Sequence, residues 1–371
     1  MEDTAGRVLR RAVQVDRDLP PFDRAAMDGF AVAAADVAPA PVHLPVVGES
    51  APGAPFTGEV QRGDAVRIMT GAAVPQGCDA VVPVEDTSGF EAVRVEIRRP
   101  VRAGANVALR GSECRAGQVA VAAGARLRAV DAGVLAMVGA ATVVVGRRPR
   151  VAVLSTGNEL VPHSETPGPD CIRNSNGPML AALAAPWSAS VALLGTARDD
   201  RADLQRCLAA GLEYEVLLVT GGVSMGAYDF VAAALERAGV RFEFRRVALQ
   251  PGKPTAFGVH SGGVVFALPG NPVSALTTFR LFASPALRLL QGEAAVWPRW
   301  SAVPAAFAWE RRHSKWLLLP GRRGAGGVER VEYAGSGDLT AYARADCQIV
   351  LPPERSRVSP GEAVDVWDLG S

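Results

Sequence analysis

Through the middle of the chain, from residue 150 to about 292, short apolar runs alternate with amphipathic segments. Uninterrupted apolar runs predict strands buried on both faces, and the segments between them have helical periodicity. This alternation is typical of an α/β fold whose doubly wound, mostly parallel sheet carries helices on both sides. The predicted strands are residues 151–154, 191–194, 216–219 and 264–268, and the predicted helices are residues 178–185, 203–211, 230–238 and 272–290.

Both ends of the chain show a different pattern, in which short β-like runs are separated by glycine- and proline-rich turns. The apolar stretch 132–146 is interrupted by glycines and is too short to span a bilayer, so it predicts a helix followed by a strand at 141–145. The other predicted strands are 42–47, 65–69, 80–84 and 92–97 before the sheet, and 316–319, 328–333, 347–351 and 363–367 after it.

These patterns divide the chain into parts of different character. An N-terminal linker or helical-β domain is expected, with a β-rich domain inserted into it. The α/β domain follows, and a small, barrel-like β-domain ends the chain. The expected boundaries are 1–30 with 125–148, then 31–124, 149–292 and 293–371.

Composition narrows the protein class. The chain has 371 residues, of which 49% are hydrophobic and 21% charged, and its net charge is +1. This charge argues against electrostatic binding of nucleic acid or of an acidic membrane. The cysteines are far apart and form no C-x-x-C motif, so buried free thiols are expected rather than disulfides or a zinc site. The absence of a signal-peptide core near Met1 agrees with a reducing cytoplasm.

The turn Leu268-Pro-Gly-Asn-Pro-Val-Ser274 joins the last predicted strand of the sheet to an amphipathic run. Gly270 and Asn271 permit a tight turn, and Pro272 suits the first position of a helix. Free backbone N–H groups at such a helix start attract anions, usually phosphate. The turn therefore predicts a binding site for a phosphorylated ligand.

Two further segments offer anion-binding groups. The run TGGVSMG at 220–226 follows a buried strand, so its backbone can approach anionic oxygens closely. The proline-flanked run QPGKPT at 250–255 holds Lys253, a natural partner of phosphate. Each alone is equally compatible with an ordinary turn or an exposed lysine. The predicted ligand-binding positions are Thr220, Gly221, Gly222, Ser224, Gly226, Pro251, Gly252, Lys253, Pro269, Gly270, Asn271, Pro272 and Ser274.

Carboxylates follow other strand ends of the same predicted sheet, where ligands of such sheets bind. They are Glu159, Asp199, Asp200 and Asp229. Carboxylates that face a phosphate site favour Mg²⁺, although each taken singly is more typical of a helix cap or a solvated charge. The chain has no H-E-x-x-H, P-loop or G-x-S-x-G motif, which disfavours the familiar zinc hydrolases, P-loop NTPases and serine hydrolases.

An ordered set of motifs runs along nearly the whole chain. They are PFDRAAMDGFAV at 21–32, RIMTGA at 67–72, STGNEL at 155–160, NSNG at 174–177, TGGVSMG at 220–226, PGKP at 251–254 and LPGNPVS at 268–274. Together they resemble the MoeA-type molybdopterin molybdenumtransferases, a family that includes the E domain of gephyrin. The ordered set is far more specific than any single motif.

The resemblance implies an enzyme of molybdenum cofactor biosynthesis. The family takes adenylylated molybdopterin and molybdate, cleaves the pyrophosphate bond with release of AMP, and inserts molybdenum into the dithiolene in a magnesium-dependent reaction. The resemblance also implies a cytoplasmic, elongated homodimer whose active site lies between the α/β domain of one subunit and an N-terminal β-domain of the other. Transient contacts with a molybdopterin adenylyltransferase and with target molybdoenzymes are expected from that role.

Residue roles also come from the resemblance. Asp28 and Thr70 match active-site positions contributed across the dimer. Lys253 matches a basic position near the ligand phosphates, and Ser336 matches a functional serine of the C-terminal domain. These four residues are predicted to be catalytic.

The acidic positions of the family's α/β domain match Glu159, Asp199 and Asp229, which are predicted to be catalytic and to bind the metal. Magnesium held by these carboxylates would neutralise the pyrophosphate and polarise the phosphorus under attack. A molybdate oxygen and a water molecule are alternative nucleophiles.

The chain departs from its relatives at a few places. Arg246 and Gln250 stand where some relatives carry lysines, so charge is kept at the first position and lost at the second. Asn158 replaces an aspartate that turns equally well. Relatives usually have some thirty further residues ahead of the position of Asp28, including a helix that packs on the α/β domain.

Two alternatives to the active enzyme stay open at this point. A catalytically impaired molybdopterin-binding or scaffold protein would retain the sheet and the phosphate loops, but the carboxylates argue against it. A molybdopterin adenylyltransferase shares the α/β domain but would not need the flanking β-domains.

Overall fold

The computed structural model describes residues 4–91, 93–198, 200–221, 227–310 and 314–369, without the side chains of 227–229. The chain forms two compact units, which are described separately. The first comprises mainly Arg11–Ala123 and Arg128–Val143, and the second comprises the residues just before Arg11 together with Gly124–Leu127 and Val144–Ser371. The division into four domains stays a prediction.

A six-stranded sheet forms the centre of the second unit, with strand order β13-β10-β14-β18-β17-β15. The first four strands of this order are parallel, whereas β17 and β15 are antiparallel. The predicted strands are confirmed, and the sequence interpretation missed only β15, at the edge of this sheet, and β17 beside it. The bounds are β10 Arg150–Thr156, β13 Ser190–Ala197, β14 Val216–Thr220, β15 Arg241–Phe244, β17 Ala256–His260 and β18 Gly263–Leu268.

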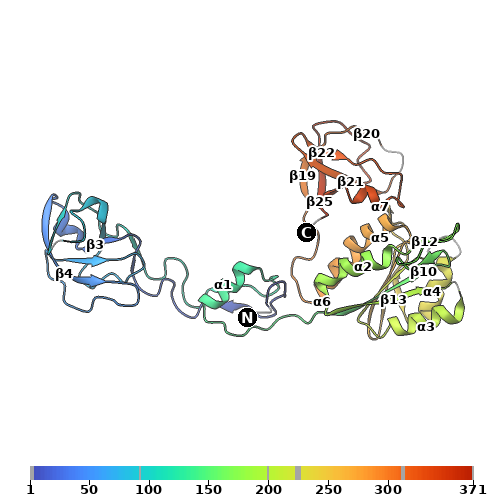
Figure 1. Ribbon diagram of the computed structural model, residues 1–371, viewed down its shortest axis with the longest axis horizontal. Helices are drawn as coiled ribbons and strands as arrows, with labels where there is room; N and C mark the ends of the chain where they lie inside the picture. Colours follow the sequence, from blue (N-terminus) through green and yellow to red (C-terminus); the bar gives the residue numbers. More distant parts are fainter. Residues whose placement is uncertain (1–3, 92, 199, 222–226, 311–313, 370–371) are drawn as a thin grey trace. The chain divides into compact units, whose positions relative to one another are not determined.

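Helices cover both faces of this sheet, as Figure 1 shows, which confirms the predicted doubly wound architecture. Leu217 and Val219 of β14 pack toward α3 and α4, while Val216 and Leu218 pack toward α2 and the last helices. Burying a side chain of this size contributes about 1.5–3 kcal/mol. The helix bounds are α2 Asn176–Ala184, α3 Arg201–Gly211, α4 Ala227–Arg237, α5 Pro272–Thr278 and α6 Ser284–Leu290.

The predicted helix over 272–290 contains one irregular turn. A π-helical turn, Phe279–Ala283, connects α5 to α6. It ends two residues before Pro285, which has no N–H for the helical ladder, so the backbone before it must depart from a regular α-helix.

A second sheet in the same unit is built from the end of the chain and has the order β16-β21-β23-β25-β19, with β22 beside β21. Its first strand, β16, lies directly before the PGKP loop and pairs in parallel with β21. The C-terminal sheet therefore anchors a loop of the α/β region. The bounds are β16 Leu249–Gln250, β19 Ser301–Pro304, β21 Trp316–Gly324, β22 Gly327–Arg330, β23 Cys347–Leu351 and β25 Ala363–Asp368.

The first unit holds a five-stranded sheet with the order β6-β3-β5-β4-β7, which confirms the predicted β-rich region. The helix α1, Ala129–Met137, is also present, but the strand expected at 141–145 is wrong. Val144 is half exposed and Val145 forms only one isolated bridge, so this apolar run has no neighbouring strand to pair with along its length. The strand bounds are β3 Gly29–Val32, β4 Val42–Ser50, β5 Ala65–Ile68, β6 Ala80–Pro83 and β7 Arg94–Ile97.

Other expectations from composition can be compared with the described residues. None of their helices is both long enough and apolar enough to cross a membrane. The five cysteines are free, as predicted, although only Cys207 and Cys347 are buried.

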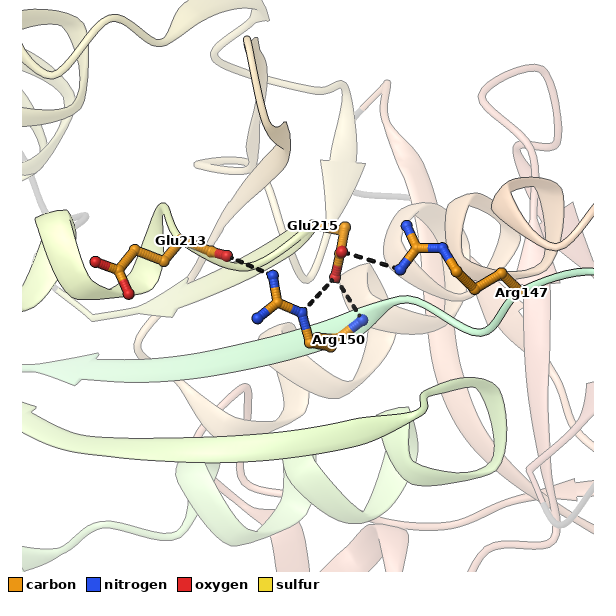
Figure 2. Close-up of polar contacts among 4 residues, drawn as sticks. All are labelled: Arg147, Arg150, Glu213 and Glu215. Atoms are coloured by element: carbon orange, nitrogen blue, oxygen red, sulfur yellow. Dashed lines mark hydrogen bonds and ion pairs between the residues drawn. The ribbon is translucent and has the colours of Figure 1, made fainter.

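An ion-pair cluster fixes the start of the central strands, as Figure 2 shows. The Glu215 carboxylate, next to β14, accepts hydrogen bonds from the Arg150 backbone N–H at 2.8 Å and from the Arg147 guanidinium at 3.0 Å. Arg150 also donates through its guanidinium to Glu215 at 3.2 Å. Burial would raise the pKa of Glu215, but these hydrogen bonds outweigh it and lower the pKa from 4.5 to about 2.

We expect Glu215→Gln to lower the free energy of unfolding by about 1–2 kcal/mol at pH 7, a figure discounted for partial solvent screening. The folded pKa lies below the unfolded one, so the stabilisation is present above about pH 4.5 and is lost as pH falls toward 2. The difference between variant and wild type should therefore shrink on acidification. Chemical denaturation at several pH values measures it.

Tryptophan fluorescence suits this measurement because the six tryptophans all lie beyond residue 186, in the second unit. Glu213→Gln is the matched control, since the exposed side chain of Glu213 forms none of the cluster's hydrogen bonds. A difference that stays constant from pH 7 to pH 3 would contradict the assignment.

Candidate functional site

A cavity of about 860 Å³ opens at the carboxyl ends of β10, β14 and β18, where the C-terminal sheet borders the α/β region. Most of the predicted ligand-binding and catalytic residues of the second unit line it. They are Glu159, Thr220, Gly221, Pro251, Gly252, Lys253, Pro269, Gly270, Asn271, Pro272, Ser274 and Ser336. Asp199, Gly222, Ser224 and Gly226 lie outside the described residues, and Asp229 lies in α4 with its side chain undescribed.

Two glycines allow the strand-end loops to meet at the cavity. Gly221 has a φ of +94°, and a Cβ there would lie 2.2 Å from the Thr156 carbonyl oxygen. A Cβ on Gly270 would lie 3.3 Å from the Cα of Gly221. The loops after β10, β14 and β18 are therefore packed backbone to backbone, which only glycine permits at position 221.

Asn176, at the start of α2, ties these loops together. Its Nδ2 donates to Thr220 Oγ1 at 2.9 Å and to the Gly270 carbonyl at 2.7 Å. Thr220 Oγ1 in turn donates to the Pro269 carbonyl at 3.0 Å. Because Thr220 and Asn176 are both buried, this chain of hydrogen bonds is shielded from competing water.

The turn between β18 and α5 binds the C-terminal domain. Val273 N–H donates to the Ser336 carbonyl at 3.1 Å, and Asn271 Nδ2 donates to Ser336 Oγ at 2.7 Å. Pro272 has no N–H, and Val273 N–H is already used. Part of the donor set expected to bind an anion at this helix start therefore holds Ser336 instead.

The PGKP loop presents Lys253 at the mouth of the cavity. A hydrogen bond of 3.0 Å from Val247 N–H to the Lys253 carbonyl and one of 2.6 Å from Thr255 Oγ1 to the Gly252 carbonyl fix the loop. Gly252 has a φ of +125° and is packed so closely that a Cβ would lie 2.4 Å from a methyl of Thr278. The exposed side chain of Lys253 therefore extends from a loop whose backbone is held in place.

Charge in the cavity favours an anionic ligand. Among the described residues, the charged side chains that line it are the cations Lys253, Arg173 and Lys315 and the carboxylate of Glu159. Gln250 lines the cavity, whereas Arg246 is not among the lining residues. Gln250 brings no charge to the cavity, but Lys315 lines the same cavity. Lys315 directly precedes β21, the strand that pairs with β16.

Glu159 lies over Gly157, in the turn that follows β10. A Cβ on Gly157 would lie 2.5 and 2.6 Å from the two carboxylate oxygens, and the φ of Gly157 is +139°. The close approach holds the carboxylate against the backbone, while the residue itself stays exposed. Glu159 is thus an accessible acceptor at the edge of a cationic cavity.

Asp200 proves to be a structural residue. Its carboxylate accepts hydrogen bonds from the N–H groups of Ala202 at 3.0 Å and Asp203 at 2.9 Å, which makes it the N-cap of α3. Capping is the ordinary role of aspartate at a helix start. Asp200 is therefore not among the residues of the cavity.

In the first unit, the structure brings Asp28 and Thr70 together. Asp28 Oδ1 accepts hydrogen bonds from the Thr70 hydroxyl and from the Thr70 backbone N–H, both at 2.7 Å. These two bonds lower the pKa of Asp28 below its usual value, so the carboxylate is ionised over a wide pH range. The motifs DGFAV and RIMTGA thus present one exposed, ordered carboxylate.

The sequence interpretation missed Asn176, Arg173 and Lys315 as lining residues. Asn176 lies within the NSNG motif, which the sequence analysis identified without assigning a role to any of its residues. Nothing in the sequence singled out Arg173 or Lys315, because a single cationic residue carries little information in a chain rich in arginine.

Comparison with protein families gives matches along most of the chain. Residues 1–139 match the MoeA N-terminal region (domains I and II), residues 152–289 a probable molybdopterin-binding domain, and residues 303–369 the MoeA C-terminal region (domain IV). A molybdopterin molybdenumtransferase of Haemophilus influenzae is 34% identical, covering 99% of this chain and 92% of the relative. The chain belongs to the MoeA family.

Other members of the MoeA family agree with this assignment. A molybdopterin molybdenumtransferase of Staphylococcus aureus is 31% identical, over 99% of this chain and 89% of its own length. A crystal structure of a molybdopterin biosynthesis MoeA protein from Pyrococcus horikoshii has a TM-score of 0.84 at 28% identity, covering 99% and 93% of the two chains. Another from the same organism has a TM-score of 0.79 at 31% identity, covering 100% and 93%.

If the Asn176 network holds the loops of this MoeA-family cavity, Thr220→Val should destabilise the second unit by about 1–3 kcal/mol. The substitution keeps the shape but leaves the Pro269 carbonyl and one amide hydrogen of Asn176 unpaired in buried surroundings. Chemical denaturation followed by tryptophan fluorescence measures the change.

Thr220→Ser is the matched control, because it keeps the hydroxyl and removes only a methyl group, for a loss of about 1 kcal/mol. Equal stability of the valine and serine variants would show that the hydroxyl does not hold the loops.

Proposed function

We propose that this chain catalyses molybdenum insertion: it takes adenylylated molybdopterin and molybdate, releases AMP and yields molybdenum-loaded molybdopterin. The observation that carries the proposal is the cationic cavity at the strand ends, with Glu159 at its edge, in a chain whose curated relatives are named molybdopterin molybdenumtransferases. Both substrates are anions, and they match the excess of positive charge.

The roles of the chain's own residues follow from their positions. Lys253, on its rigid loop, binds phosphate oxygens and stabilises negative charge that develops as the pyrophosphate bond breaks. The packed strand-end loops hold the ligand in one orientation, which lowers the entropy cost of reaction. AMP leaves when its phosphorus gains an oxygen from water or from molybdate.

Magnesium fits the donor set. Glu159 offers an exposed carboxylate beside a site for phosphates, and Mg²⁺ prefers one or two carboxylates with water and phosphate oxygens. Asp199 and Asp229 are the other proposed ligands. When bound, the ion would neutralise pyrophosphate charge and polarise the phosphorus.

The proposal includes a cytoplasmic homodimer in which Asp28 and Thr70 of one subunit complete the cavity of the other. Its support is the ordered Asp28–Thr70 pair, in which two hydrogen bonds hold one oxygen of a carboxylate that stays exposed. Transient contacts with a molybdopterin adenylyltransferase and with target molybdoenzymes belong to the same proposal. The curated relatives are named as enzymes, which favours catalysis over the scaffold alternative.

The decisive experiment measures AMP release from adenylylated molybdopterin by the purified protein with magnesium and molybdate. We expect Glu159→Gln to lower the rate at least about 100-fold, because it removes the charge of a group at the reacting pyrophosphate. Asp170→Asn is the matched control: it removes an exposed carboxylate from the same loop that lines neither of the cavities bordering that loop.

Wild-type protein that binds the substrate but releases no AMP would overturn the proposed function. Equal activity of the Glu159→Gln and Asp170→Asn variants would overturn the role given to Glu159.

A further inference from the structure

A second set of hydrogen bonds joins the C-terminal domain to α5, one helical turn beyond the contacts of Ser336. Gln348 Nε2, in β23, donates to Thr277 Oγ1 at 2.8 Å and to Tyr342 OH at 2.9 Å. All three side chains of this network are buried. Because water does not compete for buried hydrogen bonds, these bonds are strong directional links between the two domains.

The surroundings of the network are apolar. Leu318, Val350 and Trp367 of the C-terminal sheet pack with Leu281 and Phe282 of the π-helical turn after α5. Hydrophobic contacts of this kind hold two surfaces together but are non-directional, so they do not by themselves select one orientation. A buried, hydrogen-bonded polar group in such an interface can specify one arrangement among several.

Two attachments on one helix fix an orientation, whereas a single attachment leaves a pivot. Val273 N–H, in the first turn of α5, donates to the Ser336 carbonyl at 3.1 Å. Thr277 follows four residues later, on the same face of the helix and about 6 Å further along its axis. Gln348 therefore binds α5 at a second point in line with the first.

The short helix α7, Leu339–Tyr342, connects the network to the Ser336 turn. Its N-cap, Asp338, accepts a hydrogen bond from Ala341 N–H through Oδ1 and one from Ala334 N–H through Oδ2, both at 3.1 Å. One carboxylate thus holds the chain on both sides of Ser336. Because α7 ends in the tyrosine of the network, a shift of that side chain would move the helix and the serine together.

Tyr342 stays a neutral hydrogen-bonding group. Burial raises the pKa of its phenol well above the usual value. The hydroxyl therefore keeps its proton, and the network keeps the same hydrogen bonds, across the pH range of an enzyme assay.

We propose that Gln348 is a positioning residue for the reaction: with Thr277 and Tyr342, it fixes the orientation in which the C-terminal domain holds Ser336 over the cavity. Ser336 lines that cavity together with Lys253. The inference rests on the proposed function, because it takes Ser336 to act on the substrate. Gln348 itself is fully buried and acts only through the serine.

The test replaces the whole polar network by apolar side chains of nearly the same volume: Thr277→Val, Tyr342→Phe and Gln348→Met in one triple variant of the full chain. Such replacements are often neutral for stability, so we expect an unchanged midpoint of chemical denaturation. The kcat for AMP release should fall at least about tenfold with a KM within about twofold of wild type, because the loops that bind the substrate are untouched. Leu318→Met, an apolar exchange in the same interface, is the matched control and should keep the wild-type kcat.

Two further measurements separate positioning from general stability. In a Ser336→Ala background, the triple variant should lower kcat by less than about a further twofold, because a residue that acts through Ser336 then has nothing left to position. Amide hydrogen exchange at Val273, whose N–H binds the Ser336 carbonyl, should be at least about tenfold faster in the triple variant and unchanged in Leu318→Met. Tyr342→Phe alone gives the same comparison, with smaller changes, if the triple variant does not fold.

Wild-type exchange at Val273 or a wild-type kcat in the triple variant would overturn the inference. So would an equal loss of kcat with and without Ser336, or full activity of the Ser336→Ala variant. The exchange measurement needs no turnover. Wild-type protein that releases no AMP therefore refutes the proposed function, while faster exchange at Val273 in the triple variant still shows that the network positions the serine.

Discussion

The pair of hydrogen bonds from Asn176 Nδ2 is the interaction on which the cavity depends. It links the start of α2 to Thr220 and Gly270, which belong to different strand ends. Parallel strands alone would leave their following loops free to diverge, because no ladder continues past the last pair. The amide replaces that ladder with one buried side chain. Glycine is also required at position 221, since a Cβ there would lie 2.2 Å from the Thr156 carbonyl oxygen, whereas a Cβ on Gly270 would lie 3.3 Å from the Cα of Gly221.

The same constraint explains how the C-terminal domain takes part in the site. Once the turn after β18 is fixed, Asn271 and Val273 present donors in one direction, and both are used by Ser336. A second attachment comes from β16, which joins the C-terminal sheet just before the PGKP loop. Ser336 and Lys253 are therefore held at the same cavity by attachments on different strands. The sequence predicts that this turn binds phosphate, but some of its donors instead form hydrogen bonds to the C-terminal domain.

The sequence predicted those elements whose pattern is set by burial alone. β10, β14 and β18 are buried on both faces, so their apolar runs are unambiguous. β15 alternates arginine and glutamate with phenylalanine at the edge, where one face is solvated, and it was missed. The run at 141–145 is apolar without a partner strand and was wrongly predicted as a strand. Asn176 could not be assigned a role, because its acceptors are 44 and 94 residues away along the chain.

The role of a carboxylate could be predicted from the sequence only where its partners lie nearby in the chain. Asp200 caps α3 through N–H groups two and three residues ahead, a pattern visible in sequence. Glu159 differs, because its carboxylate lies so close to Gly157 that a side chain at that position would not fit. Glu159 lines the same cavity as Lys253, and the other charged side chains that line this cavity in the described part of the chain are cations. Under the proposed function, this carboxylate would hold a metal ion against the phosphate oxygens of the substrate, a role that depends on the cavity and not on the residues next to Glu159 in the sequence.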